Sequence, residues 1–422
     1  MHSESSDFSW GSVFVTAFGP SILFGIAQGT ILPVIALAAI DLGASYALSG
    51  FIAALIGIGV LFNNIPAALF TSRVGERLAL IGASFFSIVG LLLCLFSNSL
   101  WMLGCGVLMQ GMSTSVFNLA RQAYILHVVP YSLRARAFSI MGGTQRIGVF
   151  VGPFLGAGAM YLLGLKGAFW VAVVAIAATA ALCFLIPDLP TEDEPRAARK
   201  NADEHSATES TSEPATEAPT APKDQGLRQL WKILQGHYRI FLTLGIGVMC
   251  LGALRASRPI AVPLWSEYIG LSPTATAIIF GCSAAVDTLL FYPAGVIMDK
   301  YGRGWIAVPS VLLMGLAFML MPLTHQTLPF VLVTLLLGLG NGIGAGIVMT
   351  LGADAAPDNQ QLEFLGLWRV FADSGQSIGP LLMSLIIGAF SIGTGIFFIG
   401  GTGLLAGWIF GRAFFGIQRK TT

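Results

Sequence analysis

The sequence predicts an all-α membrane protein with twelve transmembrane helices in two pseudo-symmetric six-helix bundles. Three observations support this fold class. Of the 422 residues, 55% are hydrophobic and 10% are charged, with a mean hydropathy of +0.79, whereas a soluble domain is about 25% charged. Apolar runs of about 20 residues, the length that crosses the hydrocarbon of a bilayer, recur along the whole chain. A polar segment then separates these runs into two sets of six, and the two sets resemble each other.

The twelve predicted spans follow the apolar runs in chain order. Residues 12–187 hold the first six spans and residues 238–415 hold the second six. The spans are predicted at 12–40, 46–70, 78–97, 101–127, 137–163, 168–187, 238–265, 273–298, 304–323, 329–353, 363–390 and 393–415.

The distribution of Lys and Arg among the short loops predicts the orientation of the chain, because cytoplasmic loops carry an excess of these residues. Lys166 stands almost alone on one side of the predicted membrane. Both termini are therefore expected in the cytoplasm, and the protein in the cell (plasma or inner) membrane. The basic residues on the expected cytoplasmic side are Arg73, Arg77, Arg134, Arg136, Lys300, Arg303, Arg419 and Lys420.

The composition divides the chain into three regions: an N-terminal bundle (1–187), a cytoplasmic linker (188–237) and a C-terminal bundle (238–422). The linker is rich in Pro, Ser, Thr and Glu and nearly free of large apolar residues, which predicts that most of it is disordered. Its last part predicts an amphipathic helix lying along the membrane surface. The apolar face of that helix is formed by Leu227, Leu230, Trp231 and Leu234.

The two halves are related by a constant shift of 227 residues. This shift carries Pro66, Pro130 and Pro153 onto Pro293, Pro357 and Pro380, and it also pairs five glycines. Because six spans separate equivalent positions, the repeats have the same orientation in the membrane. Parallel repeats of this kind are typical of secondary transporters that bind substrate between their halves. The paired glycines are Gly43 with Gly270, Gly75 with Gly302, Gly111 with Gly338, Gly148 with Gly375 and Gly152 with Gly379.

Loop motifs give the chain a resemblance to the major facilitator superfamily over nearly its whole length. That family has a motif G-x-L-x-D-R-x-G-R-R between spans two and three and again between spans eight and nine. The second copy here consists of Gly295, Ile297, Asp299, Lys300, Gly302 and Arg303. The first copy is degraded, with Ser72 in place of the aspartate, so no aspartate-based lock is expected there. Its remaining positions are Ala68, Phe70, Arg73, Gly75, Glu76 and Arg77.

The stretch "GVFVGPFLGA" resembles the fifth-span motif of drug:proton antiporters within that family. Gly148, Gly152, Pro153 and Gly156 match the motif, while Ala157 replaces its last glycine. Small residues four apart let two helices approach closely. The resemblance implies that this stripe packs span five against the other half as a sliding contact. The family's fourth-span arginine is replaced by Val107, and Arg121 is a candidate substitute.

Arg146 lies two residues before Gly148 and so points away from the glycine stripe, about 200° round the helix. An arginine at this depth is expected to face water or the bundle interior. In the family's layout spans five and eight abut between the halves, so we expect Arg146 to approach Asp287. Because a nearby arginine favours a carboxylate and burial favours the neutral acid, Asp287 is the predicted proton carrier and Arg146 its counter-charge.

Other polar residues at membrane depth have two open interpretations each. Arg369 and Asp373, four residues apart, either pair along one helix or take part in proton coupling. Arg255 and Arg258 either extend to the outer surface or line the cavity. Uncharged polar residues either bond neighbouring helices or contact substrate. The predicted substrate cavity comprises Gln28, Asn63, Asn118, Arg121, Gln145, Arg255, Arg258, Asn341 and Gln376.

We therefore predict a secondary active transporter that works by alternating access, with proton-coupled export of a small organic or amphiphilic molecule. The alternative is a transporter of an anionic solute or lipid headgroup, because five arginines at membrane depth outnumber two aspartates. A membrane-embedded enzyme is disfavoured because the sequence shows no His/Cys/Asp cluster with ligand spacing, and ATP-driven transport because it shows no P-loop. No cofactor, metal or nucleic-acid partner is expected. The expected partners are substrate, protons and the bilayer, and the protein is expected to be a monomer.

Overall fold

The computed structural model describes residues 18–129, 133–184, 233–357 and 361–415. Within them, twelve helical segments are long and apolar enough to cross a membrane, so the protein is a multi-pass membrane protein as predicted. The N-terminal bundle contains α2 (Gly19–Ile31), α3 (Ile35–Asp41), α4 (Tyr46–Val74), α5 (Glu76–Leu95), α6 (Leu100–Val128), α7 (Arg134–Leu163) and α8 (Lys166–Phe184). The first span consists of α2 and α3, which a turn at residues 32–34 separates.

The C-terminal bundle begins with the short helix α11 (Tyr238–Ile240) and a π-helical turn (Phe241–Gly245), which continue into α12 (Ile246–Tyr268). The remaining helices are α13 (Pro273–Tyr301), α14 (Gly304–Leu320), α15 (Thr327–Ile343), α16 (Ile347–Ala355), α17 (Gln361–Ala389) and α18 (Ile392–Phe415). A break at residues 344–346 separates α15 from α16, which together form one span.

The shift of 227 residues predicted from the sequence also relates the observed helices. Moving α4 (Tyr46–Val74) by this amount gives the bounds of α13 (Pro273–Tyr301). Both helices begin at a serine N-cap, Ser45 and Ser272, whose Oγ accepts a hydrogen bond from the backbone N–H three residues later. Both end at a glycine with positive φ, Gly75 at 81° and Gly302 at 94°, a conformation that side chains disfavour. The two bundles are therefore structural repeats.

The glycine stripe of α7 packs α7 against α2 inside the N-terminal bundle, so the prediction that it contacts the other half is wrong. A side chain at Gly148 or Gly152 would collide with the carbonyl oxygen of Ile22 or Ile26, and a Cβ at Gly156 would lie 2.8 Å from Thr30. Gly375 and Gly379 make the corresponding contacts with α12, at Met249 and Ala253. Close helix packing within each bundle explains the small residues.

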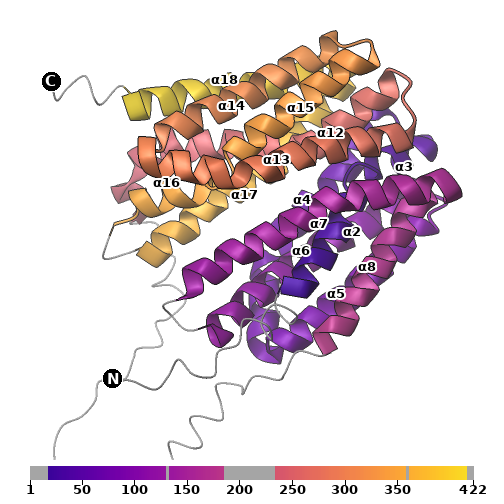
Figure 1. Ribbon diagram of the computed structural model, residues 1–422, viewed down its shortest axis with the longest axis horizontal. Coiled ribbons are helices and arrows are strands. Elements are labelled where there is room, and N and C mark those ends of the chain that lie inside the picture. Colours follow the sequence, from indigo (N-terminus) through magenta and orange to yellow (C-terminus); the bar gives the residue numbers. More distant parts are fainter. Residues whose placement is uncertain (1–17, 130–132, 185–232, 358–360, 416–422) are drawn as a thin grey trace, which may run out of the picture.

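A different face of α7 meets the other half of the molecule. Helices α7 and α13 lie side by side, and the ring of Phe154 covers Gly281, where an added Cβ would be 2.9 Å from the ring. The halves also meet at one end of the molecule, where a Cβ on Gly388 would lie 3.3 Å from that of Ala47. Toward the other end the two bundles diverge (Figure 1).

The end where the bundles diverge carries the basic turns predicted to face the cytoplasm, including Arg73, Arg77, Lys300 and Arg303. We call it the basic end. The opposite end carries two acidic residues, Asp41 and Glu267, and one basic residue, Lys166, and we call it the acidic end.

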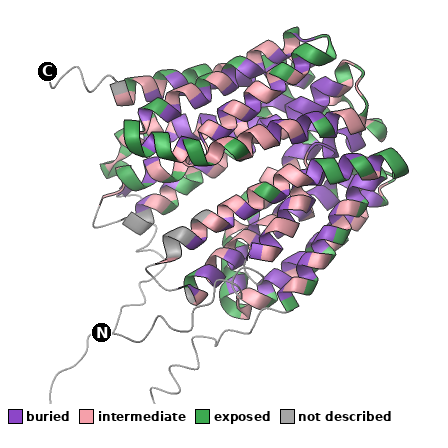
Figure 2. Ribbon diagram, viewed as in Figure 1, coloured by how far each residue is buried: buried purple, intermediate pink, exposed green. Residues whose placement is uncertain are grey.

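The outer surface of the bundles is apolar. Large side chains such as Trp101 (87% exposed), Tyr161 (83%) and Phe62 (77%) point away from the molecule, and buried residues concentrate on the inward faces of the helices (Figure 2). Apolar surface of this extent needs a nonaqueous partner, which for twelve spans is the bilayer.

The predicted linker, 188–237, is described only in its last residues. Residues 233–236 are helical, and Ile233 is buried against the hydrophobic core. Residues 188–232, with Leu227, Leu230 and Trp231 of the predicted surface helix, lie outside the described residues, as do Arg419 and Lys420.

Candidate functional site: a charged cluster and a central cavity between the bundles

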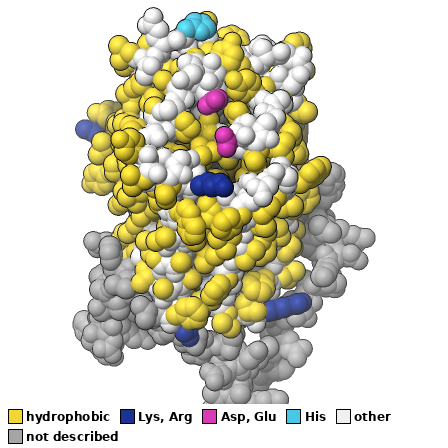
Figure 3. Space-filling view, turned by 90° about the vertical axis from the view of Figure 1, so that its right-hand side faces the viewer, with side chains coloured by type: hydrophobic (Ala, Val, Ile, Leu, Met, Phe, Trp, Pro, Cys, Tyr) yellow, Lys and Arg dark blue, Asp and Glu magenta, His cyan; other side chains and the backbone are white. Residues whose placement is uncertain are grey.

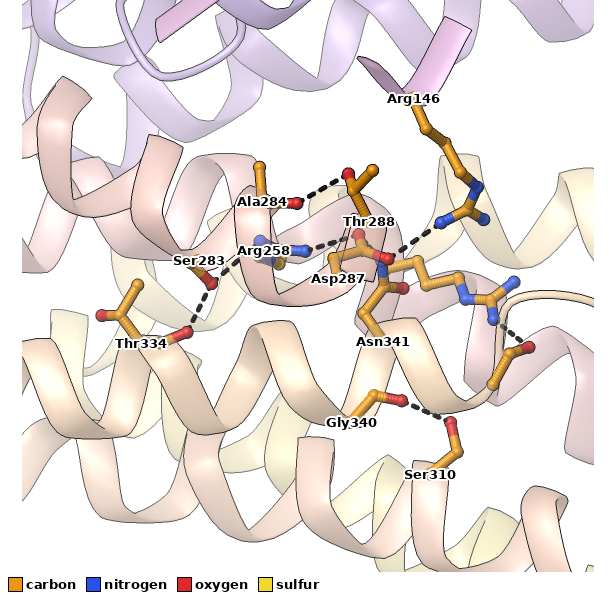
Figure 4. Close-up of polar contacts among 12 residues, drawn as sticks. Arg146, Arg258, Ser283, Ala284, Asp287, Thr288, Ser310, Thr334, Gly340 and Asn341 are labelled. Atoms are coloured by element: carbon orange, nitrogen blue, oxygen red, sulfur yellow. Dashed lines mark hydrogen bonds and ion pairs between the residues drawn. The ribbon is translucent and has the colours of Figure 1, made fainter. Parts of the chain in front are cut away.

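Asp287 of α13 stands at the centre of a charged cluster at the interface between the bundles. Its Oδ1 is 2.8 Å from Nη1 of Arg146, which comes from α7 in the other bundle. Its Oδ2 is 3.3 Å from Nη1 of Arg258 on α12 and also accepts a hydrogen bond from Asn341 on α15. Figure 4 shows the two guanidinium groups reaching Asp287 from opposite sides. The expected approach of Arg146 to Asp287 is confirmed, but Asp287 also has partners within its own bundle.

Arg258 is held firmly inside the C-terminal bundle. Its side chain is 7% exposed, and its Nη2 donates to Ser283 Oγ at 2.9 Å. Ser283 in turn donates to the carbonyl of Thr334 at 2.5 Å. The ring of Phe280 lies 5.3 Å from the guanidinium carbon, a distance typical of cation–π contacts. The interpretation that Arg258 extends to the outer surface is therefore wrong.

Arg255 also turns inward rather than to the surface. Its Nη2 donates to the carbonyl of Gly344 at 2.5 Å, at the break between α15 and α16. A helix break leaves carbonyl groups without their usual intrahelical donors, and a polar side chain can satisfy them inside a membrane protein. Arg255 thus stabilises the break, and it also interacts electrostatically with Arg146 and Asp287.

Arg146 is the more accessible partner of Asp287. Its side chain is 28% exposed, compared with 7% for Arg258, the other arginine that pairs with Asp287. The side chain of Asp287 itself is 14% exposed. The guanidinium carbon of Arg146 lies 4.9 Å from the centre of the Phe291 ring on α13, so these two contacts are both with the opposite bundle. Arg146 is therefore bound by the other half of the molecule while its backbone belongs to α7.

A second polar cluster lies within the N-terminal bundle around Arg121 of α6, which is 5% exposed. Its Nη2 donates to Gln145 Oε1 at 2.8 Å and to Asn118 Oδ1 at 3.2 Å. Gln145 donates to Gln28 at 3.3 Å, and Gln28 donates to Thr114 at 3.1 Å. Arg121 is consequently a buried residue behind the polar lining of the cavity described next.

A central cavity of about 300 Å³ lies between the two bundles. Three of the predicted cavity residues line it: Gln28, Asn118 and Gln376. Thr114, one turn before Asn118, and Ser377, next to Gln376, line it as well, although we did not predict them. Among the lining residues Asp373 is the ionisable one. The rest of the wall is mainly apolar, which is the usual composition of a small-molecule site.

Among the described residues, the other predicted site residues, with the exception of Asp373, lie outside the lining of this cavity. Asn63 donates to the carbonyl of Met112 at 2.9 Å and so bonds α4 to α6. Arg369 and Asp373 pair along α17, with 3.7 Å between Arg369 Nε and Asp373 Oδ2, and Arg369 is 55% exposed. Pairs of such exposure stabilise a protein little. Asp373 also accepts a hydrogen bond from Gln376 at 3.2 Å.

The two loop motifs lie at the basic end and make different contacts. Gly295, Asp299 and Lys300 belong to the last turns of α13, and Arg303 forms an ion pair with Asp354 at the end of α16, with 2.8 Å between Nε and Oδ2. In the first copy, Arg73 lies in the last turn of α4, and Arg77 donates to the carbonyl of Phe184 at 3.0 Å. These contacts join helices within one bundle.

Two repeated bundles of membrane-spanning helices around a shared cavity are the architecture of a secondary transporter. The sequence model of the Major Facilitator Superfamily matches residues 17–256 and 244–422. The chain belongs to this family of transporters.

Curated relatives agree with this assignment. The chain is 26% identical over 390 residues to the MFS-type transporter ppzB of Metarhizium rileyi, covering 79% of each chain. It is also 26% identical over 169 residues to the multidrug resistance protein MdtG of Enterobacter lignolyticus, covering 39% of this chain and 40% of MdtG.

Solved structures share the fold. A POT family transporter in complex with a thioalcohol-conjugated peptide superposes with a TM-score of 0.73 at 14% identity, covering 94% of this chain and 95% of that chain. The nucleoside transporter NupG superposes with a TM-score of 0.72 at 12% identity, covering 95% and 99%. At these identities the likeness concerns the fold alone.

Proposed function

We propose that the protein is a proton-coupled exporter of a small organic or amphiphilic molecule, working by alternating access. The observation that carries the proposal is the ion pair between Arg146 and Asp287, because it crosses the interface between the two bundles. A contact of this kind changes when the bundles rock against each other, so a proton carrier placed there can sense which side of the transporter is open.

Asp287 serves as the proton carrier in this proposal, and Arg258 and Asn341 position it. Arg258 and Asn341 belong to the same bundle as Asp287 and move with it. Arg146 belongs to the other bundle and departs when the interface opens. Its departure removes a positive charge that stabilises the carboxylate, so proton binding is favoured in states in which the pair is broken. Asp373, with Arg369 on its own helix, has an environment that changes less.

The central cavity is the proposed substrate site. Amide groups of Gln28, Asn118 and Gln376 offer hydrogen-bond donors and acceptors in a mainly apolar wall, which suits a small amphiphilic molecule. The similarity to MdtG, a multidrug resistance protein, supports export. The basic end faces the cytoplasm in this proposal, so both termini are cytoplasmic and the protein, a monomer, resides in the cell membrane.

The proposed domains are an N-terminal bundle (1–187), a cytoplasmic linker (188–237) and a C-terminal bundle (238–422). The linker then joins the bundles at the basic end.

Transport of an anionic solute is a second candidate, favoured by the cluster around Asp287. Arg146, Arg255 and Arg258 gather near a single carboxylate, and buried charge normally requires a counter-ion. Among the described residues, however, the central cavity is lined by Asp373 and by no arginine. The wall of the cavity therefore favours the first candidate.

A ligand screen followed by a transport assay tests the proposal. Thermal stabilisation of the purified protein is measured with amphiphilic antibiotics, organic anions and lipids, and each ligand that binds is then assayed in proteoliposomes with and without a pH gradient. Gradient-dependent movement of an amphiphilic ligand is the expected result. Gradient-independent transport would contradict proton coupling, and exclusive stabilisation by anions would favour the second candidate.

A further inference from the structure

A separate cavity of about 590 Å³ opens at the acidic end of the molecule. Its wall combines Tyr46 at the start of α4 with Trp265 and Tyr268 at the end of α12 and with His325 in the turn before α15. The cavity therefore has one wall from the N-terminal bundle and its other walls from the C-terminal bundle. It shares no lining residue with the central cavity.

The aromatic rings of this cavity contact one another across the interface between the bundles. Tyr46 and Tyr268 meet edge to face, with 6.2 Å between ring centres. Trp265 stacks on Tyr268 at 4.8 Å and lies 6.3 Å from the ring of His325. Trp265 is fixed by hydrogen bonds from its Nε1 to Thr324, whereas Tyr268 is 51% exposed. A rigid aromatic wall with exposed ring surface attracts organic cations.

The charged residues around the cavity also favour binding of a cation. Glu267 lies next to Tyr268 at the end of α12, just outside the residues that line the cavity, and within the described part of the chain it forms no ion pair. Asp41 adds a second carboxylate on the turns of this end, and Lys166 is the basic residue there. Figure 3 shows this face, where acidic side chains and, directly below them, a basic side chain lie near the middle of a mostly hydrophobic and uncharged surface. The local field therefore attracts positive charge.

We propose that the cavity beside the contact of Tyr46 with Tyr268 binds small organic cations, with quaternary ammonium compounds as the fitting chemical class. The aromatic rings contact the alkyl groups of the cation, and Glu267 supplies the compensating charge. The binding site is distinct from the proposed substrate site.

A ligand bound in this cavity should also inhibit transport. This inference rests on the alternating-access cycle proposed above. Tyr46 and Tyr268 belong to different bundles, so opening of the acidic end separates them. A cation that contacts both residues from the cavity stabilises the state in which this end is closed. It therefore acts as an inhibitor from the acidic side without occupying the central cavity.

Binding is tested by calorimetry on the purified full-length protein with benzyltrimethylammonium as the probe. Neopentylbenzene, which has the same shape without the charge, is the ligand control. Saturable binding of the cation is expected, with at least about tenfold weaker affinity in Glu267→Gln and in Tyr268→Ala. Asp41→Asn, the other carboxylate of this end, and Asp373→Asn, the carboxyl of the central cavity, are expected to change the affinity less than about twofold.

Three results would overturn the proposal: no saturable binding of the cation, equal binding of the neutral compound, or loss of binding in Asp373→Asn with retention in Glu267→Gln. The last result would place the cation in the central cavity. Thermal unfolding of each variant without ligand shows whether it is folded, so a misfolded Tyr268→Ala leaves the Glu267→Gln comparison to decide.

The inhibitory consequence is tested in proteoliposomes with the probe on the acidic side only. Inhibition in the wild type that is at least about tenfold weaker in Glu267→Gln is expected. Equal inhibition in both would overturn the inhibitory role, while the calorimetric result would stand independently of whether transport is proton-coupled.

Discussion

Arg146 and Asp287 form an ion pair of 2.8 Å that joins the two halves of the transporter. Asp287 has further partners in its own bundle, Arg258 and Asn341, but Arg146 has its contacts with Asp287 and Phe291 across the interface. The pair therefore combines one residue that is held within its own bundle and one that belongs to the other bundle.

The two arginines that bind Asp287 should differ in their effect on stability. Arg258→Gln is expected to lower the free energy of unfolding by about 3 kcal/mol, because it breaks a buried pair and removes the hydrogen bond to Ser283. Arg146→Gln is expected to cost clearly less, because Arg146 is 28% exposed and solvent screens its charge. Thermal unfolding of the two variants in detergent measures the difference. A larger loss for Arg146→Gln would contradict the assignment of Arg258 as the fixed partner.

The glycine stripe of α7 should be essential for folding of the N-terminal bundle. Gly152→Leu places a side chain against the backbone of α2, so we expect destabilisation on the order of 1–3 kcal/mol or more and reduced yield of folded protein. Gly158 lies on the same helix with no neighbouring atom within 4 Å of an added Cβ, so Gly158→Leu is the matched control and should fold normally. If both variants have wild-type stability, the close packing of α7 on α2 does not exist in the membrane.

The interface between α7 and α13 should depend on Gly281. Gly281→Val places methyl groups where the ring of Phe154 now lies, which should push the bundles apart and impair transport more than stability. The double variant Phe154→Ala with Gly281→Val removes the collision and should recover part of the transport rate. No recovery would indicate that Gly281 is needed within its own bundle.

The ion pair between Arg303 and Asp354 should contribute little to stability. It is 32% and 49% exposed, and both residues belong to the C-terminal bundle, so Asp354→Asn is expected to change the free energy of unfolding by at most about 1 kcal/mol. Chemical or thermal unfolding at low and high salt measures it. A larger loss that salt does not reduce would show that the pair is less accessible to solvent than its exposed fractions indicate.

The sequence was sufficient to predict the spans and the repeat, because both depend on local composition and on a constant spacing. The predicted spans 46–70 and 273–298 correspond to α4 and α13, which extend to Val74 and Tyr301. The approach of Arg146 to Asp287 followed from helix periodicity together with the family's arrangement of spans. Helix periodicity showed which way Arg146 points relative to Gly148.

It was harder to predict which helix packs against each face of a given helix. The stripe from Gly148 to Gly156 indicates close packing, but small residues pack equally well against any helix, so its partner α2 could not be deduced. Arg258 and Asp287 lie on consecutive helices, and which residues face each other there depends on helix rotation. That rotation is set by packing such as that of Gly342 against the backbone of Asp287, which a single sequence does not reveal.

The central claim is that Asp287 carries the proton and that Arg146 couples it to the movement of the bundles. Substrate-induced proton movement, recorded with a pH-sensitive dye in proteoliposomes containing wild type, Asp287→Asn or Asp373→Asn, tests it most directly. We expect that Asp287→Asn still binds substrate but moves no protons, while Asp373→Asn retains most of the wild-type signal. Wild-type proton movement in Asp287→Asn would contradict it.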